Sequence, residues 1–166
     1  MEKYILDMTC SGRSIWFDKK NPYTIYFDKR DIEYSQVFNG NEQKIVVHPD
    51  VVGNYEKLPF DDNTFNLVVF DPPHLIRESD TGWIQKKYGH FTTKEEALES
   101  VSKGIQEGIR VLKDKGVLIF KWNEVSIPVS EIIKHLDYTP LFGHHSGKKN
   151  ETHWMCFMKD TQNKKG

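Results

Sequence analysis

Cysteine is scarce in this chain, and the sequence has neither a long apolar run nor a large net charge of one sign. Cys10 and Cys156 are its two cysteines and form no C-x-x-C pair, which excludes a disulfide framework. The net charge of −1 over 166 residues argues against bulk electrostatic binding of nucleic acid, although it is compatible with a local basic patch. No apolar stretch is long enough to span a bilayer, so no membrane partner is expected.

The sequence also lacks the marks of export and of several domains. Met1-Glu2-Lys3 leads straight into a strand pattern, without the apolar region of a signal peptide. A length of 166 residues is typical of one domain with a sizeable core. We therefore expect a single domain over residues 1–166, located in the cytoplasm.

The most informative stretch lies at residues 66–74. Residues 66–70 form a largely apolar, β-branched run, which is typical of a strand buried on both faces. The sequence Asp71-Pro72-Pro73-His74 then ends the strand, because proline has no N–H for a sheet and fixes its own φ angle. Ligands of open α/β sheets bind beyond the carboxyl ends of the strands. The Asp71 carboxylate and the Pro72 carbonyl are both acceptors, which suits a substrate amine; alternatively, the prolines merely end the strand.

Strand and helix patterns alternate along the rest of the chain. Helices are expected at residues 14–20, 93–112 and 130–136, with Gly116 as the cap of the second helix. Residues 31–49 are polar and are expected to be irregular with one possible strand at 43–47, and residues 75–91 should form a polar loop. Strands are expected at residues 4–7, 23–28, 50–54, 66–70, 117–120, 140–144 and 152–159. This order predicts an α/β fold, a Rossmann-like and mostly parallel doubly wound sheet with a C-terminal antiparallel edge hairpin.

Three of the expected strands end in an acid, namely Asp7, Asp28 and Asp71. Asp28 lies 21 residues after Asp7, a spacing at which an acid can hydrogen-bond the ribose of a cofactor. Spacing alone allows NAD or S-adenosylmethionine, but the chain lacks the G-x-G-x-x-G loop that cradles pyrophosphate, which argues against NAD. A carboxylate beside a sulfonium cation is also electrostatically favourable. The alternative is that these acids cap loops in solvent.

Two motifs carry a resemblance to a known family. Ile5-Leu6-Asp7-Met8-Thr9-Cys10-Ser11-Gly12 resembles motif I of class I S-adenosylmethionine-dependent methyltransferases. Asp71-Pro72-Pro73-His74 resembles the D/N-P-P-aromatic motif of the amino-methyltransferases that act on adenine N6 or cytosine N4. The resemblance covers nearly the whole chain, and it is strongest to small stand-alone enzymes of phages and mobile elements. In the Gly-x-Gly-x-Gly register of motif I, however, this chain has Thr9, Ser11 and Arg13.

The resemblance implies S-adenosyl-L-methionine as the cofactor and assigns residues to it. Asp28 would bind the ribose, and the segment at residues 52–60 would border the adenine through Asn54 and Tyr55. The methionine part would meet Asp7, Met8, Thr9 and Gly12. The resemblance also implies that Asp71, Pro72, Pro73 and His74 form the catalytic motif. His74 is expected to stack on a flipped or single-stranded base, with proton acceptance as the alternative.

Residues that contact the substrate are expected in two places, in the loop after the Asp71 motif and after the strand at residues 117–120. Lys87 and Tyr88 interleave charge with aromatics, as nucleic-acid contacts often do, although a solvated loop is the alternative. Lys121, Trp122 and Asn123 follow a strand end and either line the cleft or form a polar strand exit. No metal is expected, because each of the pairs His144 and His145, and His153 and Cys156, should point to opposite faces of a strand.

These observations favour a methyltransferase acting on an amino nitrogen, with adenine N6 in nucleic acid as the first candidate. A protein Gln or Asn amide, a free nucleotide or a small amine is the alternative substrate, and a catalytically weak cofactor-binding interaction protein is the alternative class. The insertions at residues 31–49 and 75–91 are too short for a separate target-recognition domain, and no N-terminal extension is evident. We therefore expect single-stranded or structured nucleic acid as the partner, or a partner protein that supplies specificity.

Overall fold

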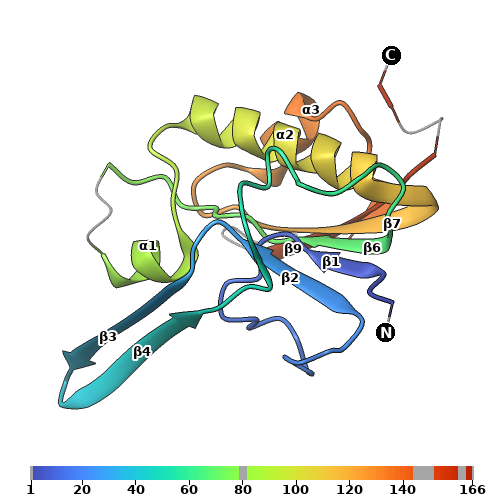
Figure 1. The fold of residues 1–166 in the computed structure, drawn as a ribbon. Coiled ribbons are helices and arrows are strands. Elements are labelled where there is room, and N and C mark those ends of the chain that lie inside the picture. Colours follow the sequence, from blue (N-terminus) through green and yellow to red (C-terminus); the bar gives the residue numbers. More distant parts are fainter. Residues whose placement is uncertain (1, 79–81, 144–151, 161–163, 166) are drawn as a thin grey trace.

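The computed structural model describes residues 2–78, 82–143, 152–160 and 164–165, and these residues form one large sheet with helices packed on it (Figure 1). Within them the sheet has seven strands in the order β5-β2-β1-β6-β7-β9-β8. A second, two-stranded sheet pairs β3 with β4. The strands are β1 (Ile5–Asp7), β2 (Thr24–Asp28), β3 (Ile32–Phe38), β4 (Asn41–Val47), β5 (Val51–Val52), β6 (Phe65–Phe70), β7 (Leu112–Asn123), β8 (Phe142–Gly143) and β9 (Thr152–Met158). The helices are α1 (Trp83–Tyr88), α2 (Lys94–Val111) and α3 (Val129–His135).

The strand directions confirm the expected Rossmann-like fold. β5, β2, β1, β6 and β7 run parallel to one another, whereas β9 is antiparallel to both β7 and β8. The chain moves from β1 to β2 on one side and later returns to β6 on the other side. Such a switch point opens a crevice at the carboxyl ends of the strands, where ligands of this fold class bind.

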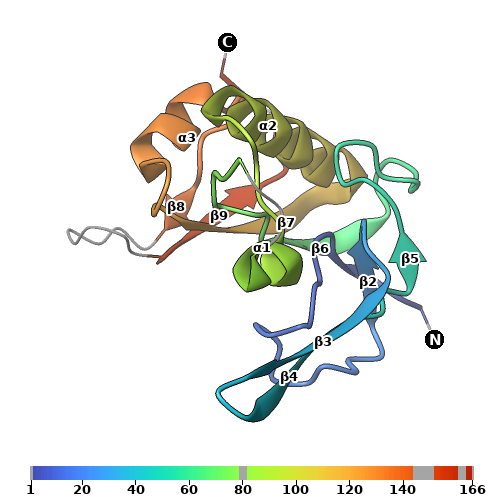
Figure 2. The same ribbon diagram turned by 90° about the vertical axis from the view of Figure 1, so that its left-hand side faces the viewer.

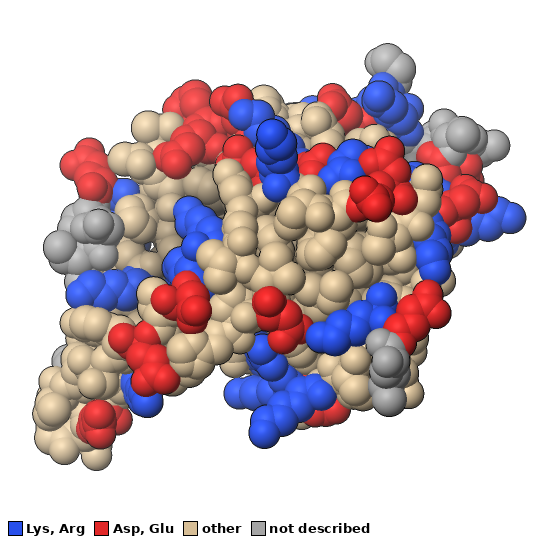
Figure 3. All heavy atoms as spheres, in the orientation of Figure 1, with Lys and Arg blue, Asp and Glu red and all other residues tan. Residues whose placement is uncertain are grey.

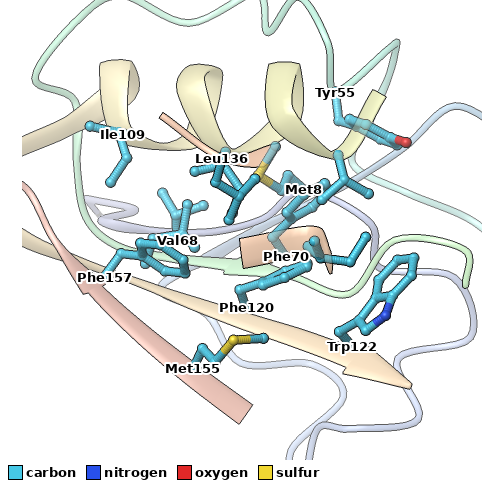
Figure 4. Close-up of a cluster of buried hydrophobic side chains, with 14 of the residues drawn as sticks. Met8, Tyr55, Val68, Phe70, Ile109, Phe120, Trp122, Leu136, Met155 and Phe157 are labelled. Atoms are coloured by element: carbon cyan, nitrogen blue, oxygen red, sulfur yellow. The ribbon is translucent and has the colours of Figure 1, made fainter. Parts of the chain in front are cut away.

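The core lies between the sheet and α2, and it is rich in aromatic side chains (Figure 4). The rings of Phe70 and Phe120 stack with their centroids 5.6 Å apart, and Trp122 packs beside Phe120. Gly104 lets α2 approach this layer, because a Cβ at that position would overlap with the Phe70 ring. The core therefore fixes the carboxyl ends of β6 and β7 against α2.

The expected helix at residues 93–112 is confirmed, but its end differs from the expectation. Thr93 caps α2 by accepting a hydrogen bond from the Glu96 N–H, as a capping box does. The chain then passes directly into β7 at Leu112, which pairs with Phe65 of β6. Gly116 lies inside β7, so the prediction that it caps the helix is wrong. Strand pairing with β6 sets the end of the helix, and local sequence does not.

Three segments differ from the sequence prediction. Residues 14–20 form turns and bends and no helix, and Arg13 holds this irregular backbone by donating to the carbonyls of Lys19 and His48. Residues 31–49, expected to be mostly irregular, form the continuous β3–β4 hairpin, which projects from the body of the protein (Figure 2). The short helix α1 lies within the expected loop at 75–91. The loop expected between the last two strands falls mainly on residues 144–151, outside the described residues.

No helix in the described ranges has the length and apolar character needed to cross a membrane.

Candidate active site

A cavity of about 420 Å³ lies at the carboxyl ends of β1, β2, β6 and β7. Its volume is in the range usual for small-molecule sites. Twelve of the residues singled out from the sequence line it, namely Asp7, Met8, Thr9, Asp28, Tyr55, Asp71, Pro72, Pro73, His74, Tyr88, Lys121 and Asn123. The structure adds Cys10, Ser11, Ser14, Ile15, Lys29, Arg30, Leu75, Gly89 and Val125, which sequence reasoning did not assign to the site.

Asp7 ends β1 at the bottom of the cavity and is 1% exposed. Its carboxylate accepts hydrogen bonds from the Thr9 N–H at 3.2 Å and from the Trp16 indole N–H at 2.7 Å. Burial raises the pKa of Asp7 to about 7, and the two hydrogen bonds offset only part of that effect. The negative charges of Asp71 and Asp28 make a smaller contribution to this raised pKa. Asp7 is therefore a carboxylate that a bound cation would stabilise.

The loop after β1 turns without glycine at its left-handed positions. Ser11 has φ 44° and Arg13 has φ 56°, a region that is strained for side chains other than glycine. The turn is held by the Ser11 N–H, which donates to Asp28 Oδ2 at 2.9 Å, and by the Arg13 N–H, which donates to the Cys10 carbonyl at 2.7 Å. Two of the three residues at the glycine positions of motif I, Ser11 and Arg13, thus adopt glycine-like backbone conformations.

The Asp28 carboxylate is occupied by Arg30. Arg30 donates to Asp28 from Nε at 2.9 Å and from Nη2 at 3.2 Å, and both side chains are largely buried. The Nη1 atom of Arg30 donates to the carbonyls of Lys86 and Lys87 at the end of α1. Ser11 Oγ donates to the same Lys87 carbonyl at 3.0 Å. Arg30 thus connects the end of β2 with α1. The only sequence signal for the Asp28–Arg30 ion pair is the spacing of the two residues in Asp28-Lys29-Arg30.

Asp71 lies beside Lys121 and is tied to the loop after β1. Lys121 Nζ is 2.7 Å from Asp71 Oδ2, and their side chains are 23% and 20% exposed. The Asp71 N–H donates to Thr9 Oγ1 at 2.8 Å. Because Phe70 pairs with Phe120 in register, the next residues of the two strands emerge side by side on the opposite face, toward the cavity. Strand register therefore creates the Asp71–Lys121 pair.

His74 follows the two prolines on the cavity wall, and its ring lies 6.4 Å from that of Trp122 in an edge-to-face arrangement. Burial lowers the pKa of His74 below its usual value of 6.5, and the Lys121 charge acts in the same direction, while Asp71 opposes both. The imidazole is therefore neutral at pH 7, which favours stacking on an aromatic ligand over acting as a cation.

Four of the singled-out residues do not line the cavity. Trp122 is 1% exposed and donates its indole N–H to the Ile127 carbonyl, so its expected place on the substrate side is corrected to the core. Asn54 is exposed and accepts from the Glu56 N–H, which makes it a turn residue. The remaining two, Gly12 and Lys87, are also absent from the cavity lining. Gly12 is exposed, with an added Cβ 3.7 Å from the Val46 carbonyl, and Lys87 accepts from Ser11 Oγ through its backbone carbonyl.

No group of three or more His, Cys, Asp or Glu side chains that could hold a metal ion is found in the part of the chain that the structure describes. His144 and His145 lie outside the described residues. His153 is buried, with Nε2 at 3.3 Å from Glu124 Oε2.

The comparisons with known proteins concern the fold. No protein-family model matches the chain, and no curated protein matches it by sequence. Among solved structures it is similar to a protein from Pyrococcus horikoshii OT3, with a TM-score of 0.56 and 15% identity over 99% of this chain and 83% of the other. It is also similar to an S-adenosylmethionine-dependent methyltransferase from Methanosarcina mazei, with a TM-score of 0.53 and 12% identity over 95% and 92% of the two chains.

A third similar structure is an rRNA methylase from Streptococcus thermophilus, with a TM-score of 0.50 and 10% identity over 99% of this chain and 89% of the other. The chain has a class I methyltransferase fold. In this methyltransferase fold the cavity lies beyond the carboxyl ends of β1, β2, β6 and β7, and both motifs quoted from the sequence reach it.

Proposed function

We propose that this protein is an S-adenosylmethionine-dependent methyltransferase that acts on an amino nitrogen, with adenine N6 in nucleic acid as its substrate. One observation carries the proposal. The Asp71-Pro72-Pro73-His74 motif and the loop after β1 share one cavity, and the Asp71 N–H donates to Thr9 Oγ1 to join them. The methyl group of the cofactor and the accepting nitrogen of the substrate would thus come together in this cavity.

The charges around the cavity fit the proposed cofactor. Asp7, Asp28 and Asp71 line the cavity together with the cationic Lys29, Arg30 and Lys121. S-adenosylmethionine carries a cationic sulfonium and a cationic ammonium, which the three acids would stabilise. The ribose hydroxyls would bind Asp28 after Arg30 has left its carboxylate, because that carboxylate now accepts from Arg30 and the Ser11 N–H. Tyr55 is 7% exposed, and its hydroxyl bonds to Ser100 within the core, so its ring forms an apolar wall. When bound, this cofactor supplies an electrophilic methyl group.

The catalytic motif would position the accepting nitrogen. An aromatic amine is a weak nucleophile because its lone pair is delocalised into the ring. The Asp71 carboxylate and the Pro72 carbonyl would accept its two N–H bonds and favour a pyramidal nitrogen aimed at the methyl group. A neutral His74 would stack on the base. The nitrogen would take the methyl group from the cofactor, the sulfur would keep the bonding electron pair, and the proton of the nitrogen would pass to the Asp71 carboxylate that accepts its N–H bond. Positioning and charge complementarity would lower the barrier.

Two aspartates separate cofactor binding from chemistry in this proposal. Asp28→Ala should weaken S-adenosylhomocysteine binding by about 1–3 kcal/mol, because buried polar partners lose their acceptor. Asp71→Ala should leave that binding within a few-fold and abolish methyl transfer. Calorimetry measures the first effect, and mass spectrometry of nucleic acid and protein incubated with each variant measures the second.

The matched control is the exposed Asp114→Ala, which should change neither quantity. The reverse pattern, with Asp71→Ala losing binding and Asp28→Ala losing only turnover, would contradict the assignment of the two acids. If methyl groups are found on Gln or Asn side chains of proteins and not on adenine, the substrate is the protein amide and not adenine. Cofactor binding with no methyl acceptor of any kind would favour the interaction-protein alternative.

A further inference from the structure

The ion pair between Lys121 and Asp71 lies in the cavity lining, where both side chains can also contact a ligand. Lys121 stands next to the proposed catalytic carboxylate because of the register of β6 and β7, on the cavity face of the sheet. Its other neighbour is the Trp154 ring of β9, with Nζ at 5.8 Å from the ring centroid. Trp154 pairs with Lys121 across β7 and β9, so the lysine is held from two neighbouring strands.

Both members of the pair keep capacity for a ligand. An ammonium has three N–H bonds, and in the described part of the chain the hydrogen bond of Lys121 goes to Asp71 Oδ2. The carboxylate offers about four lone-pair positions, and the contact with Lys121 uses one oxygen. A hydrogen-bond donor, Lys121 Nζ, and an acceptor, the Asp71 carboxylate, therefore lie side by side in the cavity lining, with Nζ 2.7 Å from Oδ2.

We propose that Lys121 and Asp71 together recognise a neutral nitrogen that is flanked by a hydrogen-bond acceptor, and that Lys121 thereby selects the substrate. The inference deepens the proposed function and rests on it. The edge of adenine that carries the amine presents an N–H donor next to the acceptor N1. Asp71 accepts from the amine while Lys121 donates to the ring nitrogen, so two parallel hydrogen bonds fix the base.

The same pair works against other nitrogen substrates. An alkyl ammonium or a guanidinium has no acceptor for Lys121 and brings a second positive charge to it, which is repulsive at short range. An amine without a neighbouring acceptor leaves Lys121 paired only with Asp71, so the second hydrogen bond, from a charged donor to the substrate, is lost. A primary amide, with its carbonyl beside its NH₂, belongs to the recognised class. Lys121 is thus assigned as a specificity-determining residue.

The test compares adenine with 1-deazaadenine, which keeps the amine but has C–H in place of N1. Both bases are placed in the same single-stranded oligonucleotide and methylated by the wild-type protein and by Lys121→Met. In the wild type the analogue should lower kcat/KM by about tenfold or more, the effect of losing a hydrogen bond to a charged group. In Lys121→Met the same replacement should change kcat/KM less than about threefold. Lys121→Arg, which keeps a donor, should retain part of the preference.

A second measurement avoids dependence on turnover. Fluorescence anisotropy of the two oligonucleotides with the S-adenosylhomocysteine complex should show the same pattern, with discrimination in the wild type and little in Lys121→Met. Lys103→Met, which removes an exposed lysine of α2, is the control and should behave as the wild type. Affinity for S-adenosylhomocysteine should be the same in all three proteins, because Lys121 contacts Asp71 and not the proposed cofactor residues.

The outcomes separate the inference from the proposed function. An equal penalty for 1-deazaadenine in the wild type and in Lys121→Met would overturn the inference, while methylation of adenine by the wild type would still support the proposed function. A wild-type protein that binds S-adenosylhomocysteine but methylates neither adenine nor an amide would overturn both.

Discussion

At the scale of single residues, Asp7 makes both stability and ligand binding depend on pH. Its carboxyl is buried at the end of β1, and burial raises its pKa from 3.8 to about 7. Between these two values the folded protein holds a proton that the unfolded chain releases. The stabilisation from the neutral form is therefore fully present below pH 3.8 and is lost as the pH rises to about 7.

This shift gives a prediction for Asp7→Asn, which is neutral at every pH. The free energy of unfolding of the wild type, relative to that of Asp7→Asn, should fall between pH 4 and pH 8 by on the order of 4 kcal/mol at most. Urea unfolding at several pH values measures the difference, and the exposed Asp114→Asn is the control. A difference that is constant with pH would contradict the prediction.

The same titration should affect ligand binding with the opposite sign. A cationic ligand interacts favourably with the ionised carboxylate, so S-adenosylhomocysteine, which carries an ammonium, should bind more tightly as the pH rises through about 7. The dependence should be absent in Asp7→Asn. Calorimetry at pH 6 and pH 8 provides the comparison.

The sequence predicted those site residues whose positions follow from strand patterns. Asp7, Asp28 and Asp71 each end an apolar strand, and parallel strands bring such ends to one edge. Arg30 could not be predicted in the same way, because its partners in α1 lie more than fifty residues away. The case of Trp122 shows the reverse error, since alternation along β7 places it on the core face while Lys121 faces the cavity.

At the scale of elements, α2 depends on two glycines, Gly104 and Gly108, where it meets the sheet. Gly104 lies against the Phe70 ring, which is itself stacked on Phe120 and cannot easily move. On an exposed helix surface, replacing glycine by alanine stabilises by up to about 1 kcal/mol. Here Gly104→Ala should instead destabilise the protein by about 1–3 kcal/mol, because the added methyl overlaps with the ring.

Thermal unfolding of Gly104→Ala and of the exposed Glu99→Ala, on the same helix, tests this prediction. Glu99→Ala should change the free energy of unfolding by less than about 0.5 kcal/mol. A stabilised Gly104→Ala would show that α2 does not pack as closely on β6 as described.

The helix α1 is held by contacts that the proposed cofactor would disturb. Arg30 and Ser11 donate to the carbonyls of Lys86 and Lys87, and the Lys86 ammonium lies over the Tyr34 ring of the hairpin. Arg30→Met should release the end of α1 and raise its amide exchange rate by about tenfold or more, since two hydrogen bonds from a charged group are lost. Exchange followed by mass spectrometry measures this, with Lys44→Met in β4 as the control.

Elements were predictable to the extent that local patterns decide them. The central strands and α2 follow from apolar periodicity, and they are confirmed. The helix expected at residues 14–20 is absent because side-chain hydrogen bonds from Arg13 and Trp16 hold an irregular path. The β3–β4 hairpin was missed in large part because most of its described side chains are exposed or half-buried, apart from the buried Ile45 and Val47, so its apolar periodicity is weak.

At the scale of the whole molecule, the surface charges are mixed in sign. On the face shown in Figure 3, Lys and Arg side chains are interspersed with Asp and Glu, in keeping with the net charge of −1. Extruding a base from a duplex costs a few kcal/mol. A surface of this kind offers little electrostatic compensation for that cost. We therefore expect methylation of single-stranded or structured nucleic acid to exceed that of a perfect duplex by about tenfold or more.

The measurement is methylation of a mixed genomic duplex and of its heat-denatured form, followed by mapping of the modified bases. A duplex with a mismatch opposite adenine is the matched control and should give intermediate rates, because unpairing is then partly complete. A sharp four- to six-base consensus on intact duplex, obtained without a partner protein, would contradict the expectation.

The hydrogen bond from the Asp71 amide to Thr9 Oγ1 couples two loops that belong to different strands. The amide hydrogen of Asp71 can exchange with deuterium only when these loops separate. We therefore expect a ligand that touches only the loop after β1 to slow amide exchange at Asp71, on the loop after β6. Deuterium exchange at the Asp71 amide, on the loop after β6, can therefore be used to follow ligand binding at the loop after β1.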